Sequence, residues 1–142
     1  MIRDRLPLLD IVGFTRLLDE NIPQVRKAGI EVRSMEYGLC RVSVPPNTDL
    51  IRPGGTMSGP AMFTLADLAL YGAVLSMVGP VVMTVTSHMN ISFLRKPAAK
   101  PMIAEARILK LGKKLAYGDV VLHSEGEDDP VAHATGAYAL PG

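Results

Sequence analysis

The longest apolar run of the chain, residues 60–78, carries the signals of a helix that other elements surround. Ser58 is a residue type that caps helix N-termini, and Pro60 suits the first helical turn. The Gly-Pro pair at residues 79–80 would end the helix. Apolar residues lie on nearly every face between these limits, which predicts a helix buried almost all round. Asp67 is the one acid in the run, and its presence there needs an explanation.

Apolar and polar positions alternate on both sides of this run, and the alternation predicts β-strands. The segment at about residues 7–28 has helical spacing instead, interrupted at Asn21 and Pro23. The predicted strands are the stretches IEVRSMEYG and LCRVSVPP before the long helix, and four more within residues 81–97, 100–112, 113–126 and 131–140 after it. This order predicts an α+β domain with an antiparallel sheet of about six strands wrapped around one long central helix, and an extra N-terminal helix.

Length and composition narrow the range of functions. A chain of 142 residues suits one domain, here with a core at about residues 30–140. A formal net charge of +1 and the absence of Trp argue against a nucleic-acid partner. Cys40 is the only cysteine, so no intrachain disulfide can form and no CxxC metal spacing exists. Neither a metal nor a cofactor is expected.

The sequence also predicts a cytoplasmic protein that does not span a membrane. The N-terminus has no long apolar signal segment, so the cytoplasm is the expected location. Residues 60–78 nearly reach a spanning length. However, Asp67 would cost roughly 2.5–3.5 kcal/mol at the centre of a bilayer.

Asp67 has apolar and aromatic neighbours along its helix. These neighbours, four residues before it and three, four and seven after it, are Phe63, Leu70, Tyr71 and Val74. An ionised carboxylate in such surroundings must find hydrogen-bond donors or take up a proton. Two interpretations follow from the residues alone: a functional carboxylate, or a structural Asp satisfied by the backbone or by a partner subunit.

Four stretches, taken in order, match the pattern of a known family. Residues 55–67, GTMSGPAMFTLAD, are similar to a family turn of the form GT-x-H-G-G that leads into a central helix. Gly59 matches the first Gly of the pair, Ser58 stands at the His position, and Asp67 falls nine residues later, as the family Asp does. The later stretches are VTSHMNISFLRKP, LKLGKKLAYGDVVL and VAHATGAYAL. Together they resemble the PaaI-type acyl-CoA thioesterases over about residues 30–140, which implies the hot-dog fold.

The resemblance implies roles for several residues of the helix and the following strand. Asp67 would act as general base on a water, or as the nucleophile, at a thioester carbonyl. The backbone N–H of Gly59 would polarise the thioester oxygen. Thr86 lies where some members carry a Ser that orients the water, although a Thr in a strand is most often a strand former. Ser58 is better explained as an N-cap than as a nucleophile, because no His or acid has the spacing of a serine triad.

Three positions depart from the family pattern. Ser58 replaces the His, Pro60 replaces the second Gly and removes an N–H, and Arg52 stands where some members carry an Asn. These departures leave open an alternative, a non-catalytic acyl-CoA-binding protein of the same fold. A hot-dog hydratase or dehydratase is a weaker possibility, because that chemistry uses a His with an acid and no His lies near the helix start.

The resemblance also implies acyl-CoA as the ligand and a homo-oligomer as the assembly. Hot-dog proteins are typically homodimers with composite active sites, often paired into tetramers as dimers of dimers. Basic residues near strand ends or turns could hold the phosphates of coenzyme A (CoA), or could be ordinary solvated charges. With Ser58, the candidate substrate-binding residues are Arg52, Arg95, Lys96, Lys113 and Lys114.

Overall fold

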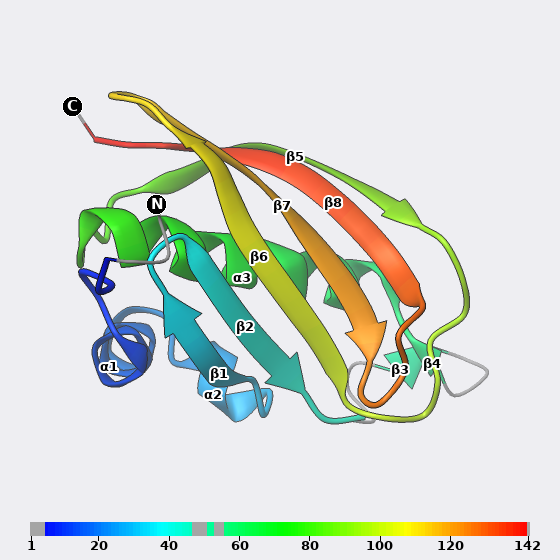
Figure 1. Ribbon diagram of the computed structural model, residues 1–142. Helices are drawn as coiled ribbons and strands as arrows, with labels where there is room; N and C mark the ends of the chain where they lie inside the picture. The colour runs from blue at the N-terminus through cyan, green and yellow to red at the C-terminus, as the bar shows by residue number, and fades with distance from the viewer. Residues whose placement is uncertain (1–4, 47–50, 53–55, 142) are drawn as a thin grey trace.

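The computed structural model describes residues 5–46, 51–52 and 56–141. Within them the chain forms a six-stranded antiparallel sheet and one long helix, preceded by two shorter helices (Figure 1). Two-residue strands β3 (Ile51–Arg52) and β4 (Thr56–Met57) pair just before the long helix, where the sequence predicted only a loop. The predicted α+β fold is confirmed.

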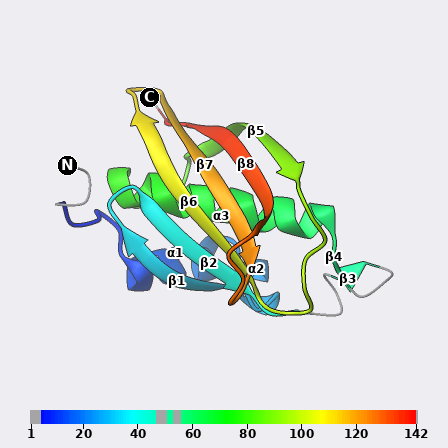
Figure 2. The ribbon, with the colours of Figure 1, turned by 45° about the vertical axis from the view of Figure 1, so that its right-hand side comes forward.

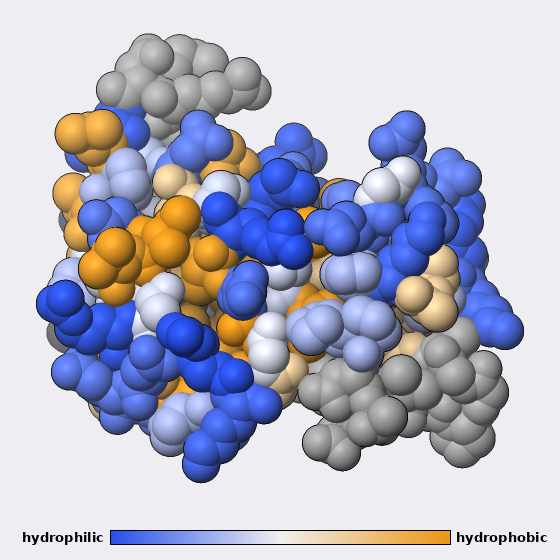
Figure 3. Space-filling view, turned by 90° about the horizontal axis from the view of Figure 1, so that it is seen from below, coloured by the Kyte–Doolittle hydropathy of each residue, from blue (hydrophilic) through white to orange (hydrophobic). Residues whose placement is uncertain are grey.

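The N-terminal helical segment is interrupted where the sequence predicted it. Helix α1 (Ile11–Asn21) is capped by Asp10, and the short helix α2 (Gln24–Lys27) follows Pro23. Gly29, with φ of 84°, then turns the chain toward the sheet. The face seen from below carries apolar surface on the side where α1 lies (Figure 3).

Four of the sheet's strands follow the long helix, and two precede it. Strands β1 (Glu31–Glu36) and β2 (Leu39–Val44) form a hairpin around Gly38, which has φ of 81°. The later strands are β5 (Val85–Phe93), β6 (Met102–Leu111), β7 (Leu115–Ser124) and β8 (Pro130–Ala139). The order across the sheet is β1-β2-β6-β7-β8-β5, so the strand that follows the long helix becomes an edge strand.

The long helix α3 (Gly59–Val78) lies along the concave side of the curved sheet, which bends over it (Figures 1 and 2). Residues 68–77 are all buried, because α1 covers part of the helix that the sheet leaves open. Phe14 of α1 packs edge-on against Tyr71, with ring centroids 5.9 Å apart. The first half of the helix is different, since Phe63 and Thr64 are exposed there. The prediction of burial on nearly every face therefore holds only for the second half of α3.

Two further details concern the same helix and the strand after it. The helix is long and apolar enough to cross a bilayer, but 72% of its most apolar stretch is buried inside the fold. Strand β5 begins at Val85 and not directly after residue 80, because residues 81–84 make a turn in which Thr84 N–H donates to Val81 O at 3.1 Å.

Candidate active site

Asp67 lies in the middle of α3, and two hydroxyl groups from the sheet hold its carboxylate. Thr86 Oγ1 on β5 donates to Asp67 Oδ1 at 2.8 Å, and the Tyr138 hydroxyl on β8 lies 2.6 Å from the same oxygen. Thr86 and Tyr138 are opposite each other in the β5–β8 register, so one cross-strand pair supplies both donors. No described residue donates to Oδ2. This second carboxylate oxygen is therefore the one that can act on an external group.

The sequence did not identify Tyr138 as a site residue, because it lies 71 residues from Asp67 in a strand with no distinguishing motif. Burial raises the pKa of its hydroxyl, and the charge of Asp67 and the hydrogen bond between them raise it further. Tyr138 therefore stays protonated at neutral pH and remains a donor. Its ring stacks on Tyr71, with centroids 5.7 Å apart and an interplanar angle of 21°.

The first turn of α3 leaves one backbone donor unbonded among the described residues. Ser58 Oγ accepts the N–H of Ala61 at 3.2 Å, and the Ser58 carbonyl accepts the N–H of Met62 at 3.1 Å. Pro60 has no N–H. The N–H of Gly59 remains, at the positive end of the helix dipole. The N-cap prediction for Ser58 is thus confirmed, and the cap and the proline together restrict the available donor to Gly59.

Gly59 also allows an aromatic ring to approach the helix start closely. A Cβ at this position would lie 3.2 Å from Cζ of Phe93, which is tighter than an ordinary contact. Phe93 is the last residue of β5, and 52% of its surface is exposed. The unbonded N–H is therefore bordered by an exposed apolar side chain.

Asp67 and Gly59 are too far apart to serve one thioester within a single chain. Asp67 is eight positions after Gly59 on α3, which is about 12 Å along the helix axis. A base and an oxyanion donor must each lie roughly 3 Å from atoms of the same small group. Gly59 and Asp67 of one chain therefore cannot act on the same thioester, and a site that uses both groups needs a second copy.

Strand β5 lies at an edge of the sheet that the described residues form. No strand within the described chain pairs with the outer edge of β5. Large apolar side chains on β5, in the segments that flank it and on the first half of α3 are exposed: Val85, Phe93, Met83, Leu94 and Phe63. A row of unpaired backbone groups beside exposed apolar surface is typical of an interaction site.

The basic candidates for CoA binding do not form one cluster within the chain. Arg95 follows β5 and donates to the Pro130 carbonyl, and exposed Lys96 comes next. Lys113 and Lys114 are exposed in the turn between β6 and β7. That turn lies beside the start of β5, because Val85 and the first residue of β7 both pair with the end of β8, so the two groups lie at opposite ends of the sheet. The side chain of Arg52 lies outside the described residues.

The curled antiparallel sheet around one long central helix is the architecture of the hot-dog class of proteins. A model of the family described as "Thioesterase superfamily" matches residues 54–131, more than half of the chain. The chain belongs to the thioesterase superfamily.

Curated relatives and solved structures agree with this assignment. A "putative esterase" of Saccharolobus solfataricus is 30% identical, over 97% of this chain and 90% of the other. The crystal structure of a "putative thioesterase" from Silicibacter sp. TM1040 is 36% identical, with a TM-score of 0.87 over 96% of this chain and 94% of that chain. The E. coli PaaI protein, from the phenylacetic acid degradation operon, shares the fold at 24% identity, with a TM-score of 0.80 over 93% and 94% of the two chains. The superfamily match and the first two of these relatives support thioester hydrolysis as the general activity, whereas the E. coli PaaI protein shows similarity of fold alone.

Proposed function

We propose that this protein is an acyl-CoA thioesterase of the PaaI type, which hydrolyses an acyl-CoA to the free acid and CoA. The observation that carries the proposal is the Asp67 carboxylate, fixed through Oδ1 by Thr86 and Tyr138 and with Oδ2 unbonded to any described residue. A thioester hydrolase needs such a group to activate water or to attack the carbonyl carbon.

In the general-base form of the reaction, Oδ2 of Asp67 takes a proton from a water molecule as the water oxygen attacks the thioester carbonyl carbon. Negative charge develops on the carbonyl oxygen, which accepts the Gly59 N–H. The C–S bond then breaks, the sulfur leaves with the electron pair, and the proton held by Asp67 passes to the thiolate. In the nucleophilic form, Oδ2 attacks first and water cleaves the resulting anhydride. Thr86 and Tyr138 hold the carboxylate in both forms.

A second copy would complete the site. Phe63 lies midway between Gly59 and Asp67 on α3 and is exposed. A two-fold axis beside Phe63 would set two α3 helices antiparallel and bring Gly59 of each copy to Asp67 of the other. The same axis would pair the two β5 edges into one continuous sheet and cover the apolar side chains around them.

This arrangement also brings the two separated groups of basic residues closer together. Antiparallel pairing of two β5 strands places the start of one beside the end of the other. Lys113 and Lys114 of one copy would then lie about three strand spacings, roughly 14 Å, from Arg95 and Lys96 of the other. The extended CoA phosphates could contact both groups. Arg52 stays a candidate for the same role.

The test is hydrolysis of acyl-CoA substrates, followed by release of the free thiol, for the wild type, Asp67→Asn and Asp128→Asn. Asp128 is an exposed acid in the turn before β8 and serves as the matched control. We expect Asp67→Asn to lower kcat by about 10²–10⁴-fold, the usual contribution of a general base, with little change in Tm. The control should keep wild-type turnover.

Two outcomes would contradict the proposal. Turnover that survives Asp67→Asn would exclude Asp67 as base and as nucleophile. Saturable binding of acyl-CoA without turnover by the wild type would favour the alternative, a non-catalytic acyl-CoA-binding protein. A single turnover in ¹⁸O-labelled water tests the nucleophilic form. Label enters the Asp67 carboxyl group only when water attacks the Asp67 carbonyl carbon of the anhydride, whereas the general-base form places the label in the product acid alone.

A further inference from the structure

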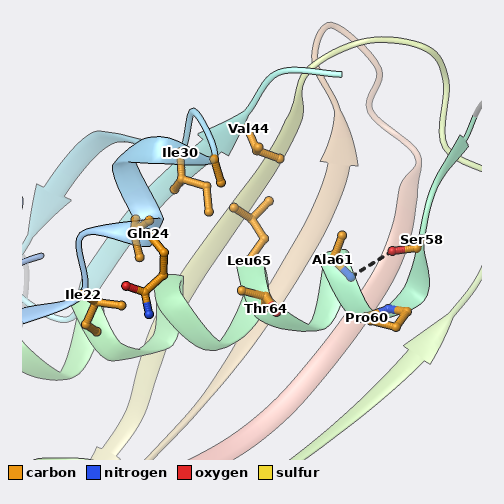
Figure 4. Close-up of a pocket in the computed structure, with 11 residues that line it drawn as sticks. Ile22, Gln24, Ile30, Val44, Ser58, Pro60, Ala61, Thr64 and Leu65 are labelled. Atoms are coloured by element: carbon orange, nitrogen blue, oxygen red, sulfur yellow. Dashed lines mark hydrogen bonds between the residues drawn. The ribbon is translucent and has the colours of Figure 1, made fainter. Parts of the chain in front are cut away.

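An apolar cavity lies between the N-terminal helical segment and the first two turns of α3. Its volume is about 500 Å³, within the usual range for a small-molecule site. The side chains of Ile30, just before β1, Val44 of β2 and Leu65 of α3 point into it (Figure 4). Ile22 and Gln24 lie toward one end of the cavity, and Ser58 and Pro60 lie at the other (Figure 4).

The lining suits an uncharged, apolar group. None of the described residues that line the cavity is charged, and most are aliphatic. The polar exceptions are hydroxyl or amide side chains: Ser58, Thr64 and Gln24. Ser58 already uses its hydroxyl to cap α3. The CoA part of a substrate, which carries several phosphate charges, could not be buried here without losing its solvation.

The cavity is placed where the acyl part of a thioester would point. Ser58, Pro60 and Ala61, which surround Gly59 in the chain, all line one end of it. A thioester whose oxygen accepts the Gly59 N–H would therefore lie near this end, with its acyl chain directed into the cavity. From Ser58 to Leu65 the helix rises about 10 Å, roughly the length of an extended chain of eight carbons.

The far wall comes from a part of the chain outside the matched family region. Ile22, Val25 and Ile30 line the cavity, whereas the superfamily model begins at residue 54. Ile22 ends α1, and Val25 is buried within α2. The far end of the cavity is therefore formed by the α1–α2 segment, which lies outside the region that the superfamily model matches.

We propose that this cavity binds the acyl group, that the preferred group is a straight saturated chain of about eight carbons, and that the α1–α2 segment limits its length. The inference rests on the proposed thioesterase function and gives it a substrate class.

The test compares kcat/KM for straight-chain acyl-CoAs from two to sixteen carbons, with phenylacetyl-CoA alongside. For the wild type we expect kcat/KM to rise about fourfold per added methylene, as each is buried, and to stop rising near eight carbons. Ile22→Trp fills the far end and should lower the octanoyl-to-acetyl ratio of kcat/KM by tenfold or more. Ala61→Leu, which narrows the cavity from α3, should act in the same direction. Lys27→Trp adds the same indole to an exposed position of α2 that does not line the cavity, and should keep the wild-type ratio.

A flat wild-type profile, a preference for phenylacetyl-CoA over octanoyl-CoA, or an unchanged ratio in both cavity variants would overturn the inference. Binding separates this failure from failure of the proposed function. Calorimetry with octanoyl-CoA and the Asp67→Asn protein measures binding of the acyl group in the absence of hydrolysis. Adding Ile22→Trp to this protein should raise Kd by tenfold or more. If no acyl-CoA is hydrolysed by the wild type but this difference in Kd is found, the catalytic proposal fails and the acyl site stands.

Discussion

At the scale of single residues, the partners of Asp67 hold its carboxylate without neutralising it. Both are hydroxyl groups, from Thr86 and Tyr138, and both bond the same oxygen. An Arg or Lys in their place would form an ion pair and stabilise the charge that a base must give up on taking a proton. The buried Tyr138 is kept protonated by its raised pKa, so its donor role is permanent at neutral pH.

Removing the Tyr138 hydroxyl tests this positioning role. A hydrogen bond to a charged group contributes about 1.5–3 kcal/mol, so we expect Tyr138→Phe to lower kcat by about tenfold or more, with a smaller change in KM. Tyr71→Phe is the matched control, because it removes a hydroxyl that donates to the Val82 carbonyl at 3.1 Å and leaves the donors to Asp67 in place. Initial rates and Tm of both variants give the answer. Equal kcat in the two variants would show that the Tyr138 hydroxyl does not position Asp67 and that the residue only packs against its neighbours.

The sequence could predict some of these residues and not others, for physical reasons. Ser58 as N-cap follows from local chemistry, since a hydroxyl before a helix meets the N–H three residues on. Asp67 stands out because a carboxylate is rare in so apolar a run. Thr86 is indistinguishable by local pattern from any strand former, and only the family resemblance marked it. Tyr138 depends on the register between two strands far apart in the sequence, which no local pattern fixes.

At the scale of elements, the periodicity of the sequence predicted where the helices and strands lie, but not which of their side chains are exposed. The ends of α3 were predictable from Ser58 and Gly79. The exposed stripe on its first half was not, because it depends on how far the sheet and α1 reach along the helix. The outer position of β5 is likewise a matter of sheet order, which strand patterns leave undetermined.

A network of charges ties three neighbouring strands together on the sheet face opposite α3. Asp119 on β7 accepts from Arg107 Nε on β6 at 2.9 Å, and its other oxygen lies 3.0 Å from His133 Nε2 on β8. Asp119 is only 9% exposed. Burial raises the pKa of its carboxyl, but the hydrogen bonds and charges of Arg107 and His133 outweigh this and lower the pKa below its ordinary value.

The lowered pKa makes stability depend on pH in a defined direction. The unfolded chain has an Asp pKa of about 3.9, so the network contributes fully above that pH and is lost as pH falls through the lower, folded value. We expect Asp119→Asn to lower the free energy of unfolding at pH 7 by about 1–2 kcal/mol, because water screens the exposed Arg107 and His133. Urea unfolding from pH 7 to pH 2.5 should show this difference shrinking below about pH 4. A difference that stays constant with pH, or one equal to that of Asp128→Asn, would contradict this account.

At the scale of the whole molecule, the proposed dimer would divide each active site between two chains. Asp67 with its hydroxyl donors lies near the middle of α3, and the Gly59 N–H lies two turns earlier. The apolar cavity opens beside Gly59, so acyl group and oxyanion would be bound by one copy and the base supplied by the other. If the site is shared in this way, the chemistry requires the unpaired edge of β5. Pairing of two β5 strands would bring Gly59 of one copy to Asp67 of the other.

Two point variants would each remove one half of the site. Gly59→Pro deletes the N–H at a position where proline suits a helix start, and Gly59→Ala is its matched control, since it adds a Cβ but keeps the N–H. Loss of one oxyanion donor costs about 10²–10³ in kcat, so Gly59→Pro should lose that much relative to Gly59→Ala. Asp67→Asn removes the base from the other half.

Combining the two variants decides whether the site is shared. Co-expression of Gly59→Pro and Asp67→Asn chains with different affinity tags, followed by purification on both tags, yields the mixed dimer. If each site takes Gly59 from one copy and Asp67 from the other, the mixed dimer has one intact site and one site lacking both groups, and about half of the wild-type kcat per dimer returns. If each site lies within one chain, both sites of the mixed dimer are damaged, and its activity stays at the level of the two parent variants. The loss in each parent and the recovery in the mixture would together establish that Gly59 and Asp67 of one chain serve different active sites.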